Sequence, residues 1–202
     1  SLNVTAQVDT RVYDSTTDSA VSPVVDELQT GDSIATAPVQ TFDNKNVGTN
    51  KTLTPAGLEI TDGNSGNNYT VNYIDNNNGE ITKRTLNLSN FTADDKTYDG
   101  TTNVTGVGFD DDRVDGDELS FNYDVAFENS NASDNVTVQY SNIEISGADA
   151  DNYSLAATAG TTTANISKRS LDVTAQVDTR IYDGTTDSAV SPVVDELQTG
   201  DS

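Results

Sequence analysis

The chain has 202 residues, of which none is Cys, Met, Trp or His, and 33 acidic residues against 10 basic ones give a formal net charge of -23. Such a surface is a poor partner for nucleic acid or an anionic membrane, because phosphate binding needs clustered Lys and Arg. Without His or Cys the usual nucleophile–base pairs and most zinc sites cannot form, so we do not expect an enzyme. No apolar run approaches the ~18 residues of a membrane-spanning helix, so we expect no direct membrane insertion.

Short strands are predicted from the first residues onward. Residues 2–8 alternate apolar and polar side chains, which is typical of a half-buried strand. Residues 23–28 are the one helical candidate, since Pro-Val-Val-Asp-Glu-Leu could form a single turn before Gly31. Further alternating or β-branched runs, each bounded by Gly, Asn or Asp, lie at 69–74, 121–127, 136–140, 143–145 and 162–166. We therefore expect an all-β chain of tandem Ig-like β-sandwich modules in an elongated array. The alternative is a β-grasp-like α+β module, which would need a real helix near 24–29.

The chain contains an internal repeat. Residues 170–202 repeat residues 1–33 with three differences, which are Asn3/Asp172, Val12/Ile181 and Ser15/Gly184. A diverged copy between them has a pitch of 84 to 85 residues, and a β-bulge near Ser89-Asn90 would absorb its one extra residue. We predict complete modules at 1–84 and 85–169 and the start of a third at 170–202, whose residues are too few to build a core alone. A second register, with units near 34–118 and 119–202, would make 1–33 the incomplete unit instead.

Two tyrosine motifs recur with the repeat. The first is a basic residue, any residue, then Tyr-Asp, and it is found at Tyr13-Asp14, Tyr98-Asp99 and Tyr182-Asp183. The second is Asn-Tyr, at Tyr69 and Tyr153. We interpret the first Tyr as an anchor at a corner between strand and turn, with Asp and the following Thr closing the turn. The alternative is a Tyr that stacks on carbohydrate. We expect the two complete modules to superpose, with Tyr13 on Tyr98 and Tyr69 on Tyr153.

The ordered set of motifs resembles the YDG-type repeats, related to the MBG repeats, of giant bacterial surface adhesins and filamentous-haemagglutinin-like exoproteins. After Tyr-Asp come Thr30-Gly31-Asp32 or Asp115-Gly116-Asp117, then Phe-Asp-Asn-Lys-Asn-Val-Gly at 42–48, residues 57–60, Asn-Tyr, and residues 81–86. Two departures are Ser15 in place of the motif Gly and Asn-Ser-Asn-Ala-Ser at 129–133. The resemblance implies an extracellular stalk or adhesive array on a bacterial surface, with any ligand often held elsewhere in the molecule.

Acidic residues of the second repeat are the candidate metal ligands. They are Asp110, Asp111, Asp112, Asp115 and Asp117, and their hard oxygens would suit calcium, although the spacing is not that of an EF-hand. The alternative is a solvated acidic loop, because the counterpart in the first repeat loses two of the five carboxylates. We expect no other cofactor.

The function expected from the sequence is that of a stalk or spacer that projects a distal adhesive region. Its partners would be neighbouring copies of the same repeat, and its negative charge would keep parallel fibres apart. The alternative is a ligand-binding adhesin repeat that recognises surface polysaccharide or a neighbouring cell.

Overall fold

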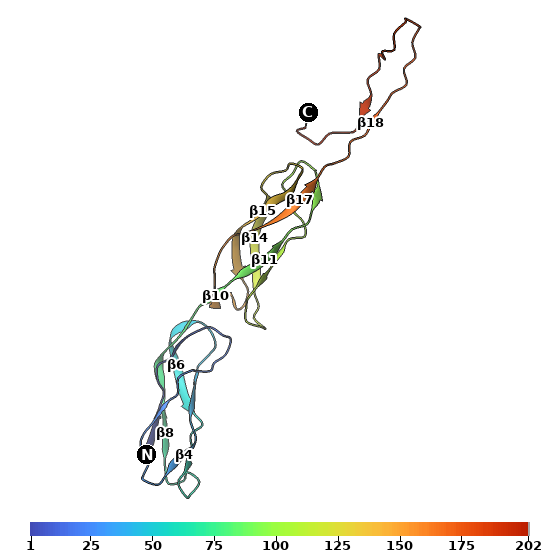
Figure 1. Cartoon of the computed structure of the whole chain (residues 1–202). Coiled ribbons are helices and arrows are strands. Elements are labelled where there is room, and N and C mark those ends of the chain that lie inside the picture. The colour runs from blue at the N-terminus through green and yellow to red at the C-terminus, as the bar shows by residue number, and fades with distance from the viewer. Residues whose placement is uncertain (202) are drawn as a thin grey trace. The chain divides into compact units, whose positions relative to one another are not determined.

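A computed structural model describes residues 1–201 and divides the chain into two compact units (Figure 1). Unit 1 consists of Ser1–Asn87, Asp111–Asn122 and Glu144–Ala157, and unit 2 consists of Leu88–Asp110, Tyr123–Ile143 and the chain from Thr158 onward. Unit 1 therefore combines the first sequence repeat with two segments of the second. The module boundaries predicted from the sequence motifs stay a prediction. The last of these modules includes residue 202, which lies outside the described residues.

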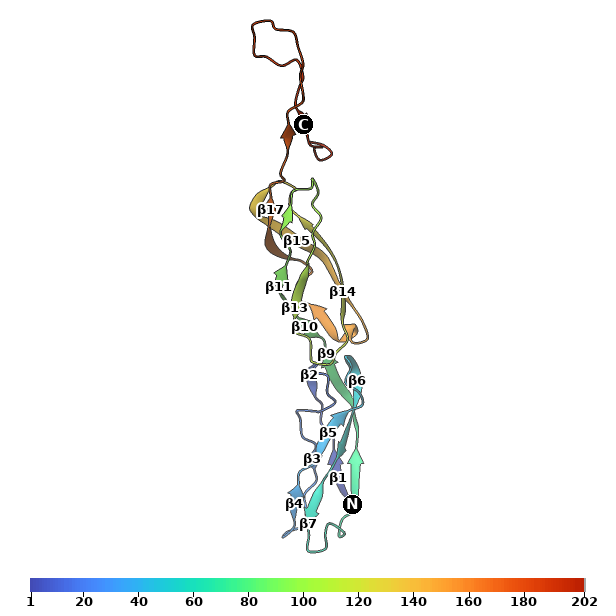
Figure 2. The same cartoon turned by 90° about the vertical axis from the view of Figure 1, so that its right-hand side faces the viewer.

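Four sheets build unit 1 (Figure 2). Their orders are β3-β1-β8, β2-β9-β6-β5, β4-β7 and β10-β16. The strands are β1 (Leu2–Thr5), β2 (Thr10–Val12), β3 (Val24–Val25), β4 (Ser33–Thr36), β5 (Val39–Phe42), β6 (Gly48–Ala56), β7 (Glu59–Thr61), β8 (Val71–Ile74), β9 (Asn76–Thr82), β10 (Arg84–Leu86) and β16 (Tyr153–Leu155). Three pairs are parallel, namely β1 with β8, β2 with β9, and β10 with β16. Because parallel neighbours need long connections, each pair joins segments far apart in the sequence.

Period-2 burial produces the core of unit 1. In β1 the Leu2 and Val4 side chains are buried while Asn3 and Thr5 are half-buried, as the alternation predicts. Across the sheets the buried apolar set includes Phe42, Leu53, Ile60, Ile81 and Leu86. Gly79 allows β9 to approach β6, since a Cβ atom there would lie 3.0 Å from the Lys51 carbonyl oxygen and 2.9 Å from the Phe42 ring.

Unit 2 is built around one larger sheet and an aromatic cluster. Its strands, some of which continue into unit 1, are β11 (Leu88–Thr92), β12 (Lys96–Thr97), β13 (Gly108–Asp111), β14 (Ser120–Phe127), β15 (Ser133–Ser146), β17 (Gly160–Ser167), β18 (Val173–Thr174) and β19 (Val193–Val194). The sheet orders are β12-β17-β15-β14, β11-β13 and β18-β19. Tyr140 lies at the centre of the cluster, with its ring 4.9 Å from Phe91 and 5.4 Å from Tyr123. Asn90 has a left-handed φ of 52° inside β11, at the place where the extra residue of the second repeat falls.

Residues from 170 onward reproduce the local structure of residues 1–33 without its burial. The Asp195 amide donates to the Asp172 carbonyl, as the Asp26 amide does to Asn3. Yet Val173 and Tyr182 are 60% and 93% exposed, whereas their counterparts Val4 and Tyr13 are 0% exposed. This stretch therefore forms its local hydrogen bonds by itself, but it does not bury its apolar side chains by itself.

The secondary structure is nearly all β, as predicted. Within residues 1–201 the only helix is the 3-10 turn η1 (Ala150–Asn152). The single helical turn expected near 23–28 is wrong, because the β-branched pair Val24–Val25 forms β3, which pairs antiparallel with β1. A β-grasp module would need a helix in this segment. None of the described residues forms a helix long and apolar enough to span a membrane.

Candidate functional site at the repeat junction

The Tyr-Asp motif closes the same turn in all three copies. The Asp14 carboxylate accepts from the Thr16 amide at 2.9 Å and from its hydroxyl at 2.8 Å. Asp99 and Asp183 bond Thr101 and Thr185 in the same way, at 2.9 to 3.0 Å. The basic residue that opens each motif also contacts the Asp carboxylate, and in the second copy the hydrogen bond from Lys96 lowers the pKa of Asp99 to about 2. The turn is therefore a local structure that needs no neighbouring segment.

The residue after the motif Asp is left-handed in every copy. Gly100 and Gly184 have φ values of 76° and 78°, and Ser15 has a φ of 68°. A non-glycine residue is strained in this region by about 1–2 kcal/mol. The Ser15 hydroxyl donates to Asp117 at 3.1 Å and accepts from Lys45 at 3.0 Å. These two hydrogen bonds offset the strain and bring Ser15 into the junction.

Tyr13 is buried by residues of the second repeat that belong to unit 1. Its side chain is 0% exposed, and its hydroxyl donates to the Asp117 carboxylate at 3.1 Å, across 104 residues of sequence. The Tyr153 ring meets it edge-on, with the ring centroids 5.5 Å apart. The first motif Tyr thus connects the two sequence repeats.

Asp117 accepts from a second tyrosine on its other oxygen. The Tyr153 hydroxyl donates to Asp117 Oδ2 at 2.5 Å and accepts from the Val114 amide at 2.9 Å. The same arrangement exists within the first repeat, where Tyr69 donates to Asp32 at 2.5 Å and accepts from the Gln29 amide at 2.9 Å. Asp32 and Asp117 therefore each accept from one tyrosine of their own repeat, and Asp117 accepts from a second tyrosine of the repeat before.

Lys45 balances the charge of this cluster, which we call the Tyr-Asp-Tyr junction (Tyr13, Ser15, Lys45, Asp117 and Tyr153). Its ammonium lies 3.3 Å from Asp117 and 3.2 Å from Asp149. Burial alone would lower the pKa of Lys45, but its contacts with Tyr13 and the two carboxylates outweigh burial and raise it. The ammonium therefore stays charged beside Asp117.

The Asp117 side chain is only 1% exposed. Burial alone would raise its pKa, but the hydrogen bonds led by that from Tyr153 outweigh burial and hold the pKa below its ordinary value. Burial and the hydrogen bond to Asp117 raise the pKa of Tyr153 to about 12. At neutral pH the junction therefore contains the ionised carboxylate of Asp117, the neutral phenol of Tyr153 and the ammonium of Lys45.

Asn152 forms a second polar link between the repeats. It is 4% exposed, its side-chain oxygen accepts from the Val47 amide at 2.9 Å, and its amide group lies 3.4 Å from the Asn46 oxygen. Residues 152–155 thus face the first repeat through Asn152 and Tyr153, while β16 pairs with β10 in the register Arg84↔Tyr153 and Leu86↔Leu155.

Burial of the motif Tyr follows how much of the next repeat the chain contains. Tyr13 is followed by a whole repeat and is fully buried. Tyr98 is followed by residues 170–202, donates to Asp201 at 2.7 Å, and is half-buried. Tyr182 has no repeat after it in this sequence and is 93% exposed. Because Asp201 and Asp117 belong to equivalent Gly-Asp pairs, the same contact recurs at both junctions.

The five calcium candidates are not gathered around one point. Asp110 bonds the Asn90 side chain at 2.7 Å, Asp111 pairs with Arg113 at 2.6 Å, and Asp112 bonds Asn87 at 2.7 Å. Asp115 is exposed, and Asp117 lies in the junction. In the part of the chain that the structure describes, no group of three or more acidic side chains could hold a metal ion. The carboxylates thus serve separate turns and pairs.

Sequence reasoning did not identify Lys45, Asn152 or the tyrosine-accepting role of Asp117. The repeats did contain a signal for Asp117. An Asp follows Gly in all three copies, at Asp32, Asp117 and Asp201, while the residue before Gly is Thr in the first and third copies and Asp in the second. A position that is retained when its neighbours vary indicates a specific contact. The sequence did not indicate that Tyr13 is a partner of Asp117, because the two residues lie 104 positions apart.

Comparison with known proteins assigns the family. The sequence profile of the YDG domain matches residues 1–76 and 82–164. No curated protein and no solved structure matches the chain. The two matched segments cover most of both sequence repeats, including Tyr13, Asp117 and Tyr153, and the chain therefore belongs to the YDG domain family.

Proposed function

We propose that this chain is an extracellular spacer in a bacterial cell-surface adhesin or surface fibre, where tandem repeats hold a distal adhesive region away from the cell. The observation that carries the proposal is the Tyr-Asp-Tyr junction. A contact made from one repeat to the next, and repeated with the motif, is the kind of feature that a length-setting element needs. Neighbouring copies of the repeat are the proposed partners.

The Tyr-Asp-Tyr junction supports the proposal because separating the two repeats there costs free energy. Separating Tyr13 from Asp117 would leave a buried carboxylate with one phenol donor fewer, and losing a hydrogen bond to a charged group costs about 1.5–3 kcal/mol. The seam between the repeats therefore resists bending. The net charge of -23 adds repulsion between parallel fibres, which keeps them separate in solution.

For the fold of each unit we propose an Ig-like sandwich. The support for this fold is that two different sheets of unit 1 each bury apolar side chains. Leu2 and Val4 of β1 belong to one sheet, Leu53 and Ile81 to the other, and all four are at most 2% exposed. Two sheets that each bury one face are the arrangement expected of a sandwich.

The ligand-binding alternative is weaker at Tyr13 than at the exposed Tyr182. A Tyr that stacks on a sugar must present one face of its ring, and Tyr13 is 0% exposed whereas Tyr182 is 93% exposed. At the Tyr-Asp-Tyr junction, recognition of polysaccharide or of another cell would therefore have to use other side chains. A glycan array with the full chain separates the proposals, because a spacer binds no glycan above background and a ligand-binding repeat binds a defined set.

Small-angle X-ray scattering tests the mechanical claim. We expect the wild-type chain to give a narrow distribution of maximum dimensions and Asp117→Asn to broaden it, because the variant loses the charged acceptor at the seam. Asp32→Asn is the matched control, since the Asp32 side chain accepts from Tyr69, a tyrosine of its own repeat. Equal distributions for wild type and Asp117→Asn would overturn the spacer mechanism.

A further inference from the structure

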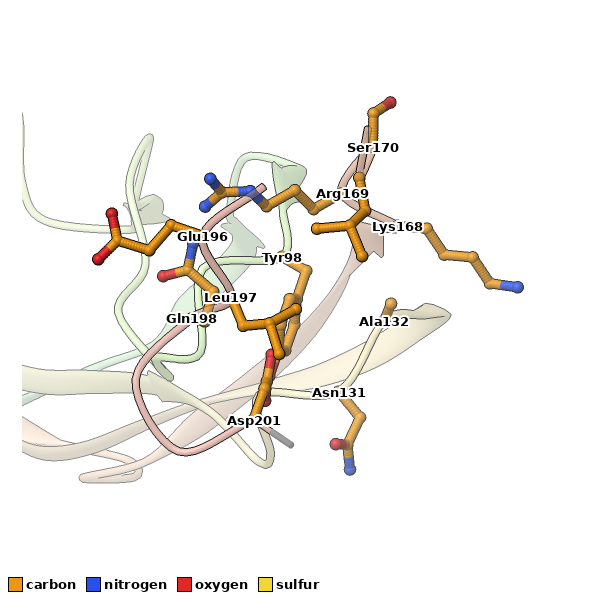
Figure 3. Close-up of a pocket in the computed structure, with 11 residues that line it drawn as sticks. Tyr98, Asn131, Ala132, Lys168, Arg169, Ser170, Glu196, Leu197, Gln198 and Asp201 are labelled. Carbon is orange, nitrogen blue, oxygen red and sulfur yellow. The ribbon is translucent and has the colours of Figure 1, made fainter. Parts of the chain in front are cut away.

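Unit 2 contains a cavity of about 330 Å³ at the junction between the second repeat and residues 170–201. Its lining includes Tyr98, Asn131, Ala132, Leu197 and Asp201 (Figure 3). Leu171 also lines it. Leu171 and Leu197 are 44% and 46% exposed, so the cavity presents apolar surface to solvent. Lys168, Arg169 and Glu196 also border it, so that with Asp201 its rim carries charges of both signs.

The lining residues have counterparts in unit 1 at the same positions of the repeat. Tyr98 corresponds to Tyr13, Asn131 to Asn46, Ala132 to Val47, Leu171 to Leu86 and Asp201 to Asp117. The backbone supports this alignment, because the Tyr98 amide donates to Ser167 as the Tyr13 amide does to Thr82. The Asp201 amide likewise donates three residues back, to Gln198, as the Asp117 amide does to Val114.

In unit 1 these counterparts hold one short strand, residues 152–155. Asn152 bonds the Val47 amide and approaches Asn46. Tyr153 packs on Tyr13 and bonds Asp117. Leu155 is in register with Leu86, whose carbonyl accepts from Ala156 at 2.9 Å. Five lining residues of the cavity in unit 2 thus occupy the repeat positions that enclose Asn-Tyr-Ser-Leu in unit 1, four with the same side chain and one with Ala132 in place of Val47.

Burial shows what the strand contributes. Leu86 is 0% exposed beside β16, whereas its counterpart Leu171 is 44% exposed. Asp117 accepts hydrogen bonds from two tyrosines and is 7% exposed as a whole residue. Asp201 accepts from Tyr98 and is exposed. The edge at Ser170–Leu171 corresponds to the edge of β10 that pairs with β16 in parallel.

We propose that this cavity is a receiving site for the Asn-Tyr strand of another copy of the YDG repeat. The strand enters parallel to residues 169–171, its Asn side chain bonds the backbone near Asn131–Ala132, and its Tyr hydroxyl donates to Asp201. Main-chain hydrogen bonds to an open edge supply affinity, while the Asn and Tyr positions supply specificity. The inference rests on the proposed function in that it names the segment through which the next repeat is joined.

A peptide of residues 148–157 tests the site directly. We expect it to bind the full chain saturably in a fluorescence anisotropy titration, and to shift the amide signals of Tyr98, Leu171 and Asp201 in NMR spectra. Leu171→Arg should weaken binding about 10-fold or more, because it removes the apolar contact at the centre of the site. A peptide with Tyr153→Ala should lose binding to the same extent. Leu171 is 44% exposed, so its replacement leaves the fold intact, which a thermal melt verifies.

Val177→Arg is the matched control, since Val177 lies in the same segment, is 91% exposed and does not line the cavity. It should bind the peptide as wild type does. Absence of binding at about 1 mM peptide, a Kd scale at which a binding free energy is near -4 kcal/mol, would overturn the inference. Equal binding to Leu171→Arg and wild type would overturn it too, because the peptide would then bind elsewhere. The experiment leaves Asp117 unchanged. Failure here together with a broadened Asp117→Asn scattering profile would therefore reject the receiving site and leave the spacer function standing.

Discussion

The junction at Asp117 and the junction at Asp201 use the same motif and differ in what encloses it. At Asp117 the carboxylate accepts from Tyr13 and Tyr153, and its side chain is 1% exposed. At Asp201 the carboxylate accepts from Tyr98 and remains exposed to solvent. The comparison teaches that the turn motif is local, whereas its burial comes from the Asn-Tyr strand of the following repeat. The same substitution of the Asp should therefore change the free energy of unfolding more at Asp117 than at Asp201.

The largest expected effect is that of Asp117→Asn. It removes a buried carboxylate that two phenols and Lys45 contact, so we expect a loss of about 3 kcal/mol in the free energy of unfolding. Asp201→Asn, at the exposed equivalent, should cause no measurable loss. Urea denaturation followed by tyrosine fluorescence measures both. Similar losses for the two variants would contradict the comparison.

The next effect isolates the second tyrosine. Tyr153→Phe keeps the ring against Tyr13 but leaves the Val114 amide and Asp117 Oδ2 without the hydroxyl, which should cost about 2 kcal/mol. Tyr69→Phe makes the same change at the half-buried Asp32 pair and should cost less. Thermal melting temperatures of the two variants rank the sites. A larger decrease for Tyr69→Phe would show that burial does not set the difference.

The pH dependence sharpens the assignment of charge. Because the pKa of Asp117 is lowered in the folded chain, its contribution to stability is present above the unfolded pKa of about 3.9 and is lost as the pH falls through the folded pKa. The stability gap between wild type and Asp117→Asn should therefore be widest near neutral pH and shrink in acid below about pH 4. Chemical denaturation across this range measures the gap. A gap that stays constant down to strongly acidic pH would mean that the carboxylate is not ionised in the junction.

The sequence predicted what is local and missed what joins distant segments. The alternation that places Leu2 and Val4 on one face is visible within a few residues, and so is the Asp14–Thr16 turn. The helical turn predicted at 23–28 failed because Val24 and Val25 pair with β1, a contact that composition does not reveal. Ser15 departs from the motif glycine, yet the structure keeps the left-handed backbone there and stabilises it with a hydrogen bond to Asp117.

Asp117 shows why the site itself was harder to predict than the fold class. Beside Asp110–Asp112 it looked like part of an ion-binding run, because sequence proximity groups carboxylates that the fold then separates. Its actual partners, Tyr13 and Lys45, lie 104 and 72 residues away. The parallel pairing of β10 with β16 helps to bring the two repeats together, and no local pattern specifies that pairing.

A double-mutant cycle between Tyr13 and Asp117 tests the central claim most directly. The free energy of unfolding would be measured for wild type, Tyr13→Phe, Asp117→Asn and the double variant, with Tyr98→Phe and Asp201→Asn as the control cycle. The cycle reports the coupling of the two groups across the repeat junction, free of their separate contributions. We expect a coupling of about 1 kcal/mol or more between Tyr13 and Asp117, as for a hydrogen bond to a charged group, and no measurable coupling in the control cycle. A coupling near zero between Tyr13 and Asp117 would contradict the claim that this contact joins one repeat to the next.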